Sequence, residues 1–294
     1  MRISQRQQIE SAVRYLHQNQ SAMEELRSQL GAQRRILKPD DDPQGAQQAI
    51  RARGALSAVQ NSLRNLDQSQ GWMEATASGL GELTRILSSA RLEALRGASE
   101  TLSDDIRQTI ADEIHEYFQQ AVNTANTQHL GYHVFAGYRI DAQPFVADLM
   151  NHTVAYQGDA GEIRHELEPG TQTVVNVAGS DPLFNAAFIA LKDLYDGLMA
   201  GDAAAVRASV DALDAGVDLC LRQQAAIGAR LRVLDETRSR LQDFEVDLKG
   251  LLSGIEDLDM PEAILNLTSY EGSYQAMLHT AARIMPLSLF DYLL

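Results

Sequence analysis

Hydrophobic side chains recur in alternating steps of four and three residues from Val206 to Ile255. A repeat that averages 3.5 residues keeps one side of a helix turned toward the same neighbour, so the pattern predicts one continuous helix that lies against another helix. At 1.5 Å per residue this helix would be roughly 75 Å long. We therefore expect an elongated, mostly α-helical fold built around a coiled-coil rod of long helices. The buried positions of this helix, the predicted rod core, are Val210, Leu213, Val217, Cys220, Ile227, Leu231, Leu234, Leu241 and Leu248.

Both ends of the chain carry narrower apolar stripes of the same kind. A short helix with so narrow a stripe is poorly stable alone. We expect the two terminal helices to pair with each other and then with neighbouring copies, because exposed apolar stripes mark assembly surfaces. This predicted terminal surface consists of Ile9, Val13, Leu16, Met23, Leu30, Ile264, Leu267, Tyr274, Leu278, Ala281, Met285, Leu289 and Phe290.

The segment from Lys38 to Pro43 interrupts the helical pattern. Pro39 disfavours helical geometry at Lys38, whereas Asp42 directly before Pro43 is a good N-cap with proline at the first helical position. The three adjacent carboxylates at 40–42 could also bind a cation, but the alternating spacing of a calcium loop is absent. A capped turn is therefore the favoured interpretation.

The middle of the chain changes from helix chemistry to strand and turn chemistry. A helix is predicted from Pro43 to about Arg96, where Gly97 ends it. Helices resume at Asp181-Pro182. Between these regions, strands are predicted at 132–138, 154–156, 162–167 and 173–177.

These elements predict a mostly α fold with a small β-rich inserted domain. Residues 1–42 and 259–294 would form the terminal assembly domain. Residues 43–139 and 180–258 would form the helical rod, and residues 140–179 the β-rich insert.

Composition and charge disfavour several function classes. The chain of 294 residues has a formal net charge of −15, whereas a nucleic-acid groove needs clustered Lys and Arg. Its single cysteine, Cys220, can form no internal disulfide, and its place on the apolar stripe favours a small buried side chain over a nucleophile. No apolar run approaches the roughly 20 residues of a membrane span. The first ten residues also lack the apolar core of a secretory signal.

Catalytic motifs are also missing from the sequence. We find no Gly-rich phosphate loop, no HExxH, no nucleophile beside a plausible base and no metal-ligand cluster. We therefore predict a protein that is not an enzyme and that uses no cofactor and no metal. An enzyme on a helical scaffold is the alternative from another class, which stoichiometric zinc or turnover of a substrate would support.

Four strings of residues, in this order along the chain, resemble bacterial flagellin and its relatives. They are LGAQRRILKPDDDPQGA, FAGY with a following PF, YQGD, and DPLF. The proline after the carboxylates is similar to the hook-associated branch of the family rather than to flagellin proper. Gln33 departs from the usual glycine, so the first helix is expected to run on smoothly there. The family-motif residues are Arg35, Pro39, Asp41, Asp42, Pro43, Phe135, Ala136, Gly137, Tyr138, Pro144, Phe145, Gly158 and Asp159.

The resemblance implies a structural protein of the extracellular bacterial flagellum. Such proteins are exported by the flagellar type III apparatus and polymerise through their terminal helices, which line an inner tube while the insert faces outward. For the hook-associated branch, the implied role is an adaptor at the junction of hook and filament. The implied partners are hook-associated protein 1, flagellin, further copies of the chain in a ring-like layer, and an export chaperone that shields the C-terminal stripe. A flagellin filament subunit is the alternative.

Overall fold

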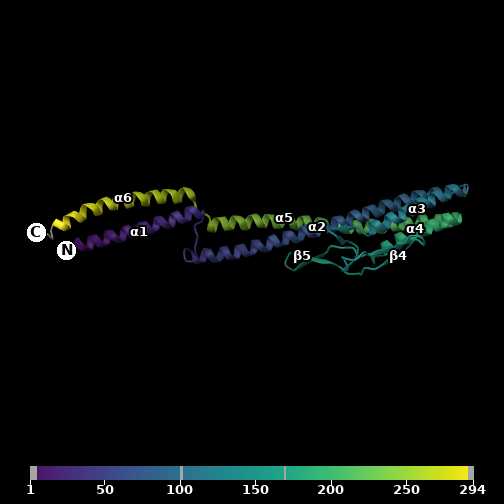
Figure 1. Cartoon of the computed structure of the whole chain (residues 1–294), viewed down its shortest axis with the longest axis horizontal. Coiled ribbons are helices and arrows are strands. Elements are labelled where there is room, and N and C mark those ends of the chain that lie inside the picture. Colours follow the sequence, from purple (N-terminus) through teal and green to yellow (C-terminus); the bar gives the residue numbers. More distant parts are fainter. Residues whose placement is uncertain (1–4, 100–101, 169, 291–294) are drawn as a thin grey trace. The chain divides into compact units, whose positions relative to one another are not determined.

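The computed structural model describes residues 5–99, 102–168 and 170–290, except for the side chains of 5, 6, 8, 9 and 283–290. Its described part consists of long helices and short strands (Figure 1). The helices are α1 (Gln5–Ala32), α2 (Pro43–Gly97), α3 (Asp104–Ala125), α4 (Pro182–Ala200), α5 (Ala203–Glu256) and α6 (Met260–Phe290). The strands are β1 (Gln128–His129), β2 (Tyr132–His133), β3 (Phe145–Asp148), β4 (Thr153–Tyr156), β5 (Arg164–Glu168) and β6 (Thr171–Val174).

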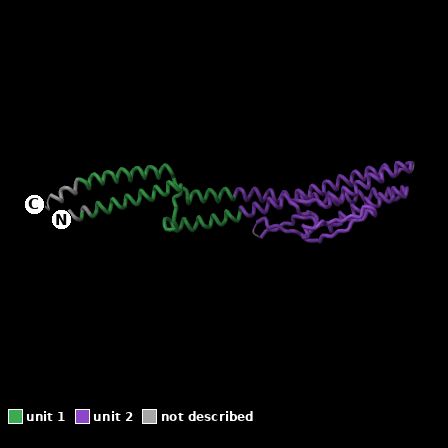
Figure 2. Tube along the Cα trace, in the orientation of Figure 1, with its two compact units in different colours: residues 1–59, 244–294 green, residues 60–243 purple. Residues whose placement is uncertain are grey.

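The chain folds into two compact units, and each combines segments that are far apart in the sequence (Figure 2). Unit 1 contains residues 1–59 and 244–294, and unit 2 contains residues 60–243. The boundaries between the units fall inside α2 and α5, so both helices contribute to both units. The three-domain division drawn from the sequence stays a prediction.

The predicted fold class, long helices with a small β-rich insert, is confirmed. The helix expected over 206–255 is α5, and the helix expected from Pro43 to about Arg96 is α2. In α5 every seventh residue from Val206 to Ile255 is buried, and in α2 the same holds from Ala52 to Ala94. A buried line with this spacing is the signature of a helix that packs along its length against another helix.

The helix starts follow the expected capping chemistry. Asp42 caps α2, because its carboxylate accepts a hydrogen bond from the Gly45 N–H at 2.9 Å and Pro43 occupies the first helical position. Asp181 caps α4 in the same way, with the Leu183 N–H 3.0 Å from its carboxylate. The capped turn favoured from the sequence is therefore confirmed.

The end of α1 differs from the expectation. Gln33 adopts the left-handed conformation with φ 55°, and α1 stops at Ala32 instead of running on. The Arg34 N–H donates to the Gln29 carbonyl at 3.1 Å, and the Gln33 N–H donates to Leu30 at 3.4 Å. This is a Schellman ending, and the hydrogen bonds that it makes hold Gln33 in a position that glycine usually occupies.

Unit 2 has a core of large apolar side chains from four helices. Phe118 of α3, Leu87 of α2 and Leu194 of α4 are almost completely buried, as is Cys220 of α5. Burial raises the pKa of the Cys220 thiol to about 11, so it stays protonated at neutral pH. Its position indicates a packing role rather than a reactive thiol.

The strands form three separate antiparallel hairpins, in which β1 pairs with β2, β3 with β4, and β5 with β6. The strands predicted near 154–156, 162–167 and 173–177 correspond to β4, β5 and β6, whereas β1 and β3 were not predicted. The prediction of one strand over 132–138 is wrong beyond His133. Gly137 turns the chain with φ 71°, and the Phe135 carbonyl accepts from the Gly179 N–H at 2.7 Å rather than from a strand.

Two glycines with positive φ in this region make a matched test of the turn. Alanine at Gly137 (φ 71°) would meet the side chain and backbone of Asp159, whereas alanine at Gly131 (φ 86°) would meet nothing. We expect Gly131→Ala to lower the free energy of unfolding by about 1 kcal/mol through backbone strain alone. Gly137→Ala should cost at least about 1 kcal/mol more. Chemical denaturation followed by circular dichroism measures both, and equal losses would contradict the assigned contact.

Candidate assembly site

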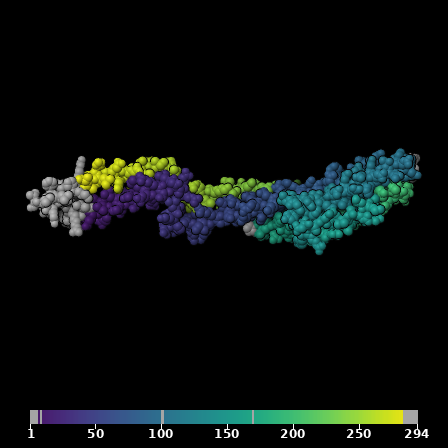
Figure 3. All heavy atoms as spheres, in the orientation of Figure 1, coloured from purple at the N-terminus to yellow at the C-terminus, as the bar shows by residue number. Residues whose placement is uncertain are grey.

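The first and last helices of the chain lie side by side in unit 1, α1 against α6 (Figure 1). Arg27 of α1 and Glu271 of α6 form an ion pair with 2.8 Å between Nη2 and Oε1. Farther along, the Asn19 amide lies 3.9 Å from the Met277 sulfur. Helices α1 and α6, far apart in sequence, thus form one pair of neighbouring helices. Figure 3 shows their described atoms in contact.

Pairing leaves much of the apolar surface of these helices uncovered. Among the residues of the predicted terminal surface, Val13, Ile264 and Leu278 are exposed. Leu265, which the prediction left out, is 71% exposed beside Ile264, and we add it to the terminal surface. The half-buried members are Leu16, Met23, Leu30, Leu267, Tyr274 and Ala281. The side chains of Ile9, Met285, Leu289 and Phe290 lie outside the described residues. Each described member of the terminal surface therefore keeps apolar area open to solvent.

A hollow of about 600 Å³ lies between α1 and α6 toward the chain ends. Its lining combines small side chains with three larger ones, Gln7 and Tyr15 of α1 and Met277 of α6. The Ser11 and Thr280 hydroxyls donate to carbonyls of their own helices, and the lining has no carboxylate, histidine, lysine or cysteine that would activate a hydroxyl for catalysis. The hollow is a gap in the packing of two amphipathic helices.

A second feature of unit 1 joins the turn after α1 to the break between α5 and α6. The Arg35 N–H donates to the Glu256 carbonyl at 2.7 Å, and the Arg35 guanidinium donates to the Ile255 carbonyl at 2.8 Å. Arg34 and Asp257 form an isolated antiparallel bridge. We call this contact the helix junction. The carbonyls at the end of α5, which have no partner within the helix, thus receive donors from the N-terminal part of the chain.

Glu256 places a carboxylate inside the helix junction. Its side chain is 11% exposed and lies 2.6 Å from the guanidinium of Arg53 and 3.9 Å from that of Arg34. A negative charge at the C-terminal end of a helix is unfavourable, and the two arginines offset it. Sequence reasoning missed Glu256 and Arg53, because their pairing joins positions 203 residues apart. The available signal was a carboxylate in the last turn of α5 opposite an arginine-rich N-terminal region.

The family-motif residues of the turn between α1 and α2 hold its shape. The Asp41 carboxylate accepts from the N–H groups of Leu37 at 2.9 Å and Lys38 at 2.7 Å, which lowers the pKa of Asp41. The hydrogen bond from Gly45 likewise lowers the pKa of Asp42, and Arg35 adds an ion pair at 3.2 Å. Both carboxylates thus accept hydrogen bonds from backbone N–H groups of the turn. Pro39, between Lys38 and the aspartates, is exposed.

The remaining family-motif residues meet at one place in unit 2, where the hairpins join the helices. The Asp159 carboxylate accepts from the Tyr138 N–H at 2.7 Å and the Gly161 N–H at 2.8 Å, and these hydrogen bonds lower its pKa. The Asp159 N–H donates to Ala136 at 3.2 Å. The other members found there are Phe135, Gly137, Pro144, Phe145 and Gly158.

Aromatic rings also pack where the hairpins join the helices. The rings of Phe135 and Phe145 lie 4.8 Å and 5.0 Å from the ring of Phe184 in α4. The Tyr156 hydroxyl donates to the Asp159 carbonyl at 2.7 Å. The strings FAGY, PF, YQGD and DPLF therefore form the root of the β-rich insert on the helices, which is a structural arrangement rather than a reactive one.

The predicted rod-core positions on α5 fall into two classes. Leu213, Cys220, Ile227, Leu234, Leu241 and Leu248 are buried. Val210, Val217 and Leu231 are half-buried. The buried set repeats every seven residues, so one position of each heptad faces the packed side and the other lies at its edge.

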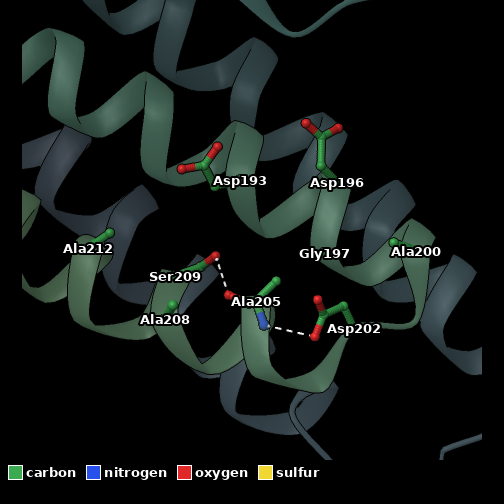
Figure 4. A pocket seen from close by; sticks show the side chains of 9 residues that line it. All are labelled: Asp193, Asp196, Gly197, Ala200, Asp202, Ala205, Ala208, Ser209 and Ala212. Carbon is green, nitrogen blue, oxygen red and sulfur yellow. Dashed lines mark hydrogen bonds between the residues drawn. The ribbon is translucent and has the colours of Figure 1, made fainter.

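A hollow of about 420 Å³ between α4 and α5 offers no chemistry of its own (Figure 4). Two of its polar side chains hold local structure: Asp202 accepts from the Ala205 N–H at 3.1 Å, and the Ser209 hydroxyl donates to the Ala205 carbonyl at 3.0 Å, whereas Asp193 is exposed. Asp196 on its rim pairs with Lys192. Within the described ranges, no three His, Cys, Asp or Glu side chains are placed to hold a metal ion. None of the helices so described is long and apolar enough to cross a bilayer.

Removal of the Glu256 carboxylate tests the helix junction. Glu256→Ala leaves Arg53 without its 2.6 Å partner, and we expect the junction to open about tenfold more often, a loss of about 1.4 kcal/mol. Limited trypsinolysis at Arg34 and Arg35, followed by mass spectrometry, should show faster cleavage of about that factor. Asp247→Ala removes an exposed carboxylate from the same helix and should leave the rate unchanged. Identical cleavage of all three proteins would show that Glu256 does not hold the junction.

Comparison with known proteins agrees with these features. Residues 3–139 match the model of the bacterial flagellin N-terminal helical region. Over 99% of both chains, the sequence is 25% identical to flagellar hook-associated protein 3 of Salmonella typhimurium.

Solved structures show the same fold. A putative flagellar hook-associated protein from Vibrio parahaemolyticus superposes with a TM-score of 0.67 at 19% identity, covering 74% of this chain and all of that one. FlgL of Bacillus cereus gives 0.61 at 20% identity, covering 69% of this chain and 99% of that one. Residues 3–139 therefore carry the N-terminal helical region of bacterial flagellin, and the chain has the fold of the flagellar hook-associated proteins that it resembles.

Proposed function

We propose that this chain is a structural adaptor at the junction between the hook and the filament of a bacterial flagellum. The observation that carries the proposal is the similarity to hook-associated protein 3 from end to end, over 99% of each chain. The carboxylates of Asp159 at the insert root and of Asp41 in the turn after α1 support a structural role, because they accept hydrogen bonds from backbone N–H groups.

The terminal surface is the part of the molecule that would join copies and partners. A pair of helices can cover only one side of each member, and Val13, Leu265 and Leu278 remain exposed in unit 1. Burial of each such side chain would contribute about 1.5–3 kcal/mol, so a few of them suffice to drive assembly. The partners in this proposal are further copies of the chain, hook-associated protein 1 on one side, and flagellin on the other.

Export precedes assembly in this proposal. A chain that is passed unfolded through the flagellar type III apparatus exposes its C-terminal apolar stripe before it can pair with α1. A dedicated chaperone would shield that stripe by laying it into an apolar groove. No enzymatic step is part of the proposal.

A gene deletion in the source bacterium tests the proposal, with electron microscopy of hooks and an immunoblot for flagellin in the medium. We expect complete hooks without filaments and flagellin released as monomer. Filaments of normal length would contradict the adaptor role. Complete hooks with no flagellin antigen in the medium would instead identify the chain as the filament subunit.

Complementation of the deletion strain separates the terminal surface from the fold. We expect a Leu265→Ser, Leu278→Ser double variant to be secreted but to restore filaments poorly, because both exposed side chains would lose their contacts with neighbours. Leu92→Ser, at a 59% exposed position of α2 in unit 2, is the matched control and should restore filaments fully.

A further inference from the structure

The β3–β4 hairpin of unit 2 is attached to the helices at two separate points. At its base, the Asn126 side chain at the end of α3 both donates to the Phe145 carbonyl at 2.9 Å and accepts from the Phe145 N–H at 3.0 Å. The Phe145 ring lies 5.0 Å from Phe184 and 5.6 Å from Phe188 of α4. This base attachment contains no group that titrates near neutral pH.

At its tip, the hairpin is attached through one histidine. His152 lies in the turn between β3 and β4, with φ 49° and only 5% of its surface exposed. Its Nε2 lies 2.8 Å from Nδ1 of His115 on α3. Its ring stacks on Tyr195 of α4 with 4.0 Å between centroids and contacts Phe118 at 5.2 Å.

Hydrogen bonds to Asp148 hold the turn that contains His152. The Asp148 carboxylate accepts from the N–H groups of Met150 at 3.0 Å and Asn151 at 3.3 Å and from the Asn151 side chain at 2.6 Å. A left-handed conformation at a bulky residue such as His152 is costly and persists only where surrounding contacts hold it. The contact with His115 is therefore a candidate for what holds the tip in place.

We propose that the His115 and His152 pair is a proton-sensitive latch, in which the hydrogen-bonded neutral imidazoles hold the tip of the β3–β4 hairpin on α3 and α4. Protonation of His152 releases the tip while the base at Phe145 stays attached. The latch is independent of the assembly role proposed above, because it lies in unit 2 and involves no terminal helix.

The chemistry follows from one shared proton. In a hydrogen bond between two imidazoles, one nitrogen donates its N–H and the other accepts with its lone pair. Protonation of His152 places an N–H on its Nε2, which then has no lone pair to accept a hydrogen bond from Nδ1 of His115 at 2.8 Å, and it puts a positive charge on a buried ring.

The charges around His152 set the direction of its titration. Burial is the main cause that lowers the pKa of His152 below 6.5, and the neighbouring His115 and Lys192 of α4 lower it further. Asp196 of α4 and Asp148 of the hairpin oppose this shift. Because the pKa is lower in the docked state, the docked tip binds fewer protons than the released tip. The latch is therefore complete above pH 6.5 and is lost as the pH falls through the lower, docked-state pKa.

Hydrogen exchange measured by mass spectrometry on the full chain tests the latch. Protection factors of the backbone amides at 146–156 are compared between pH 7.5 and pH 5, after correction for the intrinsic pH dependence of exchange. One proton taken up on release changes the equilibrium by at most about tenfold per pH unit. We expect protection at the tip to fall by about threefold to tenfold for each pH unit below 6.5, with Phe145 and the helices unchanged.

Three variants assign the effect. His152→Asn keeps a residue that tolerates positive φ, and His115→Gln keeps a good helix former in α3. Each should give a less protected tip at pH 7.5. The pH dependence should disappear in His152→Asn and become weaker in His115→Gln, where the buried His152 still titrates. His165→Gln is the matched control, since His165 of β5 is a half-buried histidine whose pKa is likewise lowered by burial and whose Nδ1 lies 2.7 Å from the Ser69 hydroxyl. It should keep the wild-type response.

Two results would overturn the latch. One is wild-type tip protection that does not change between pH 7.5 and pH 5. The other is a pH response that survives in His152→Asn, that keeps its full wild-type size in His115→Gln, or that disappears in His165→Gln.

Discussion

Burial of one residue in every seven along two long helices is the constraint on which the structure depends. The line runs from Ala52 to Ala94 on α2 and from Val206 to Ile255 on α5, without interruption in either helix. A single helix cannot remove such a line from water, so each needs a partner along its whole length. Since α5 begins more than a hundred residues after α2 ends, the N-terminal and C-terminal halves of the chain must pack together before either helix is stable.

The same requirement organises both units. In unit 1 the first and last helices pair, and the turn after α1 supplies donors to the open end of α5. In unit 2 the hairpins attach to the helices through buried aromatic rings and a few backbone hydrogen bonds at the insert root. A fold of paired helices also leaves apolar positions such as Leu265 and Leu278 uncovered, and these exposed side chains are the basis of the proposed assembly role.

Local patterns in the sequence predicted most of the helical fold. The heptads of α5 and the caps at Asp42 and Asp181 are short-range signals, and the corresponding helices begin and end within a few residues of the expected positions. The expected run of α1 through Gln33 failed because the hydrogen bonds of the Schellman ending outweigh the preference of glutamine for a helical conformation. The strand expected beyond His133 failed because distant partners, Gly179 and Asp159, bind the backbone of Phe135 and Ala136.

The candidate site residues also fall into two groups, those that spacing within one helix could predict and those that depend on contacts between separate elements. Periodicity could single out the terminal surface and the rod core, since both depend on spacing within one helix. It could not find Glu256 with Arg53, or His115 with His152, because these pairs join separate elements and neither member stands out in its own segment.

The pairing of the two chain ends is the central claim, and cross-linking tests it most directly. Asn19→Cys and Met277→Cys would be combined in a Cys220→Ala background and treated with a short bismaleimide at low protein concentration. The side chains lie 3.9 Å apart, so the account predicts rapid cross-linking within single chains, seen as one cross-linked peptide pair in a monomer. Cross-links found only between chains, or none at all, would contradict the pairing of α1 with α6.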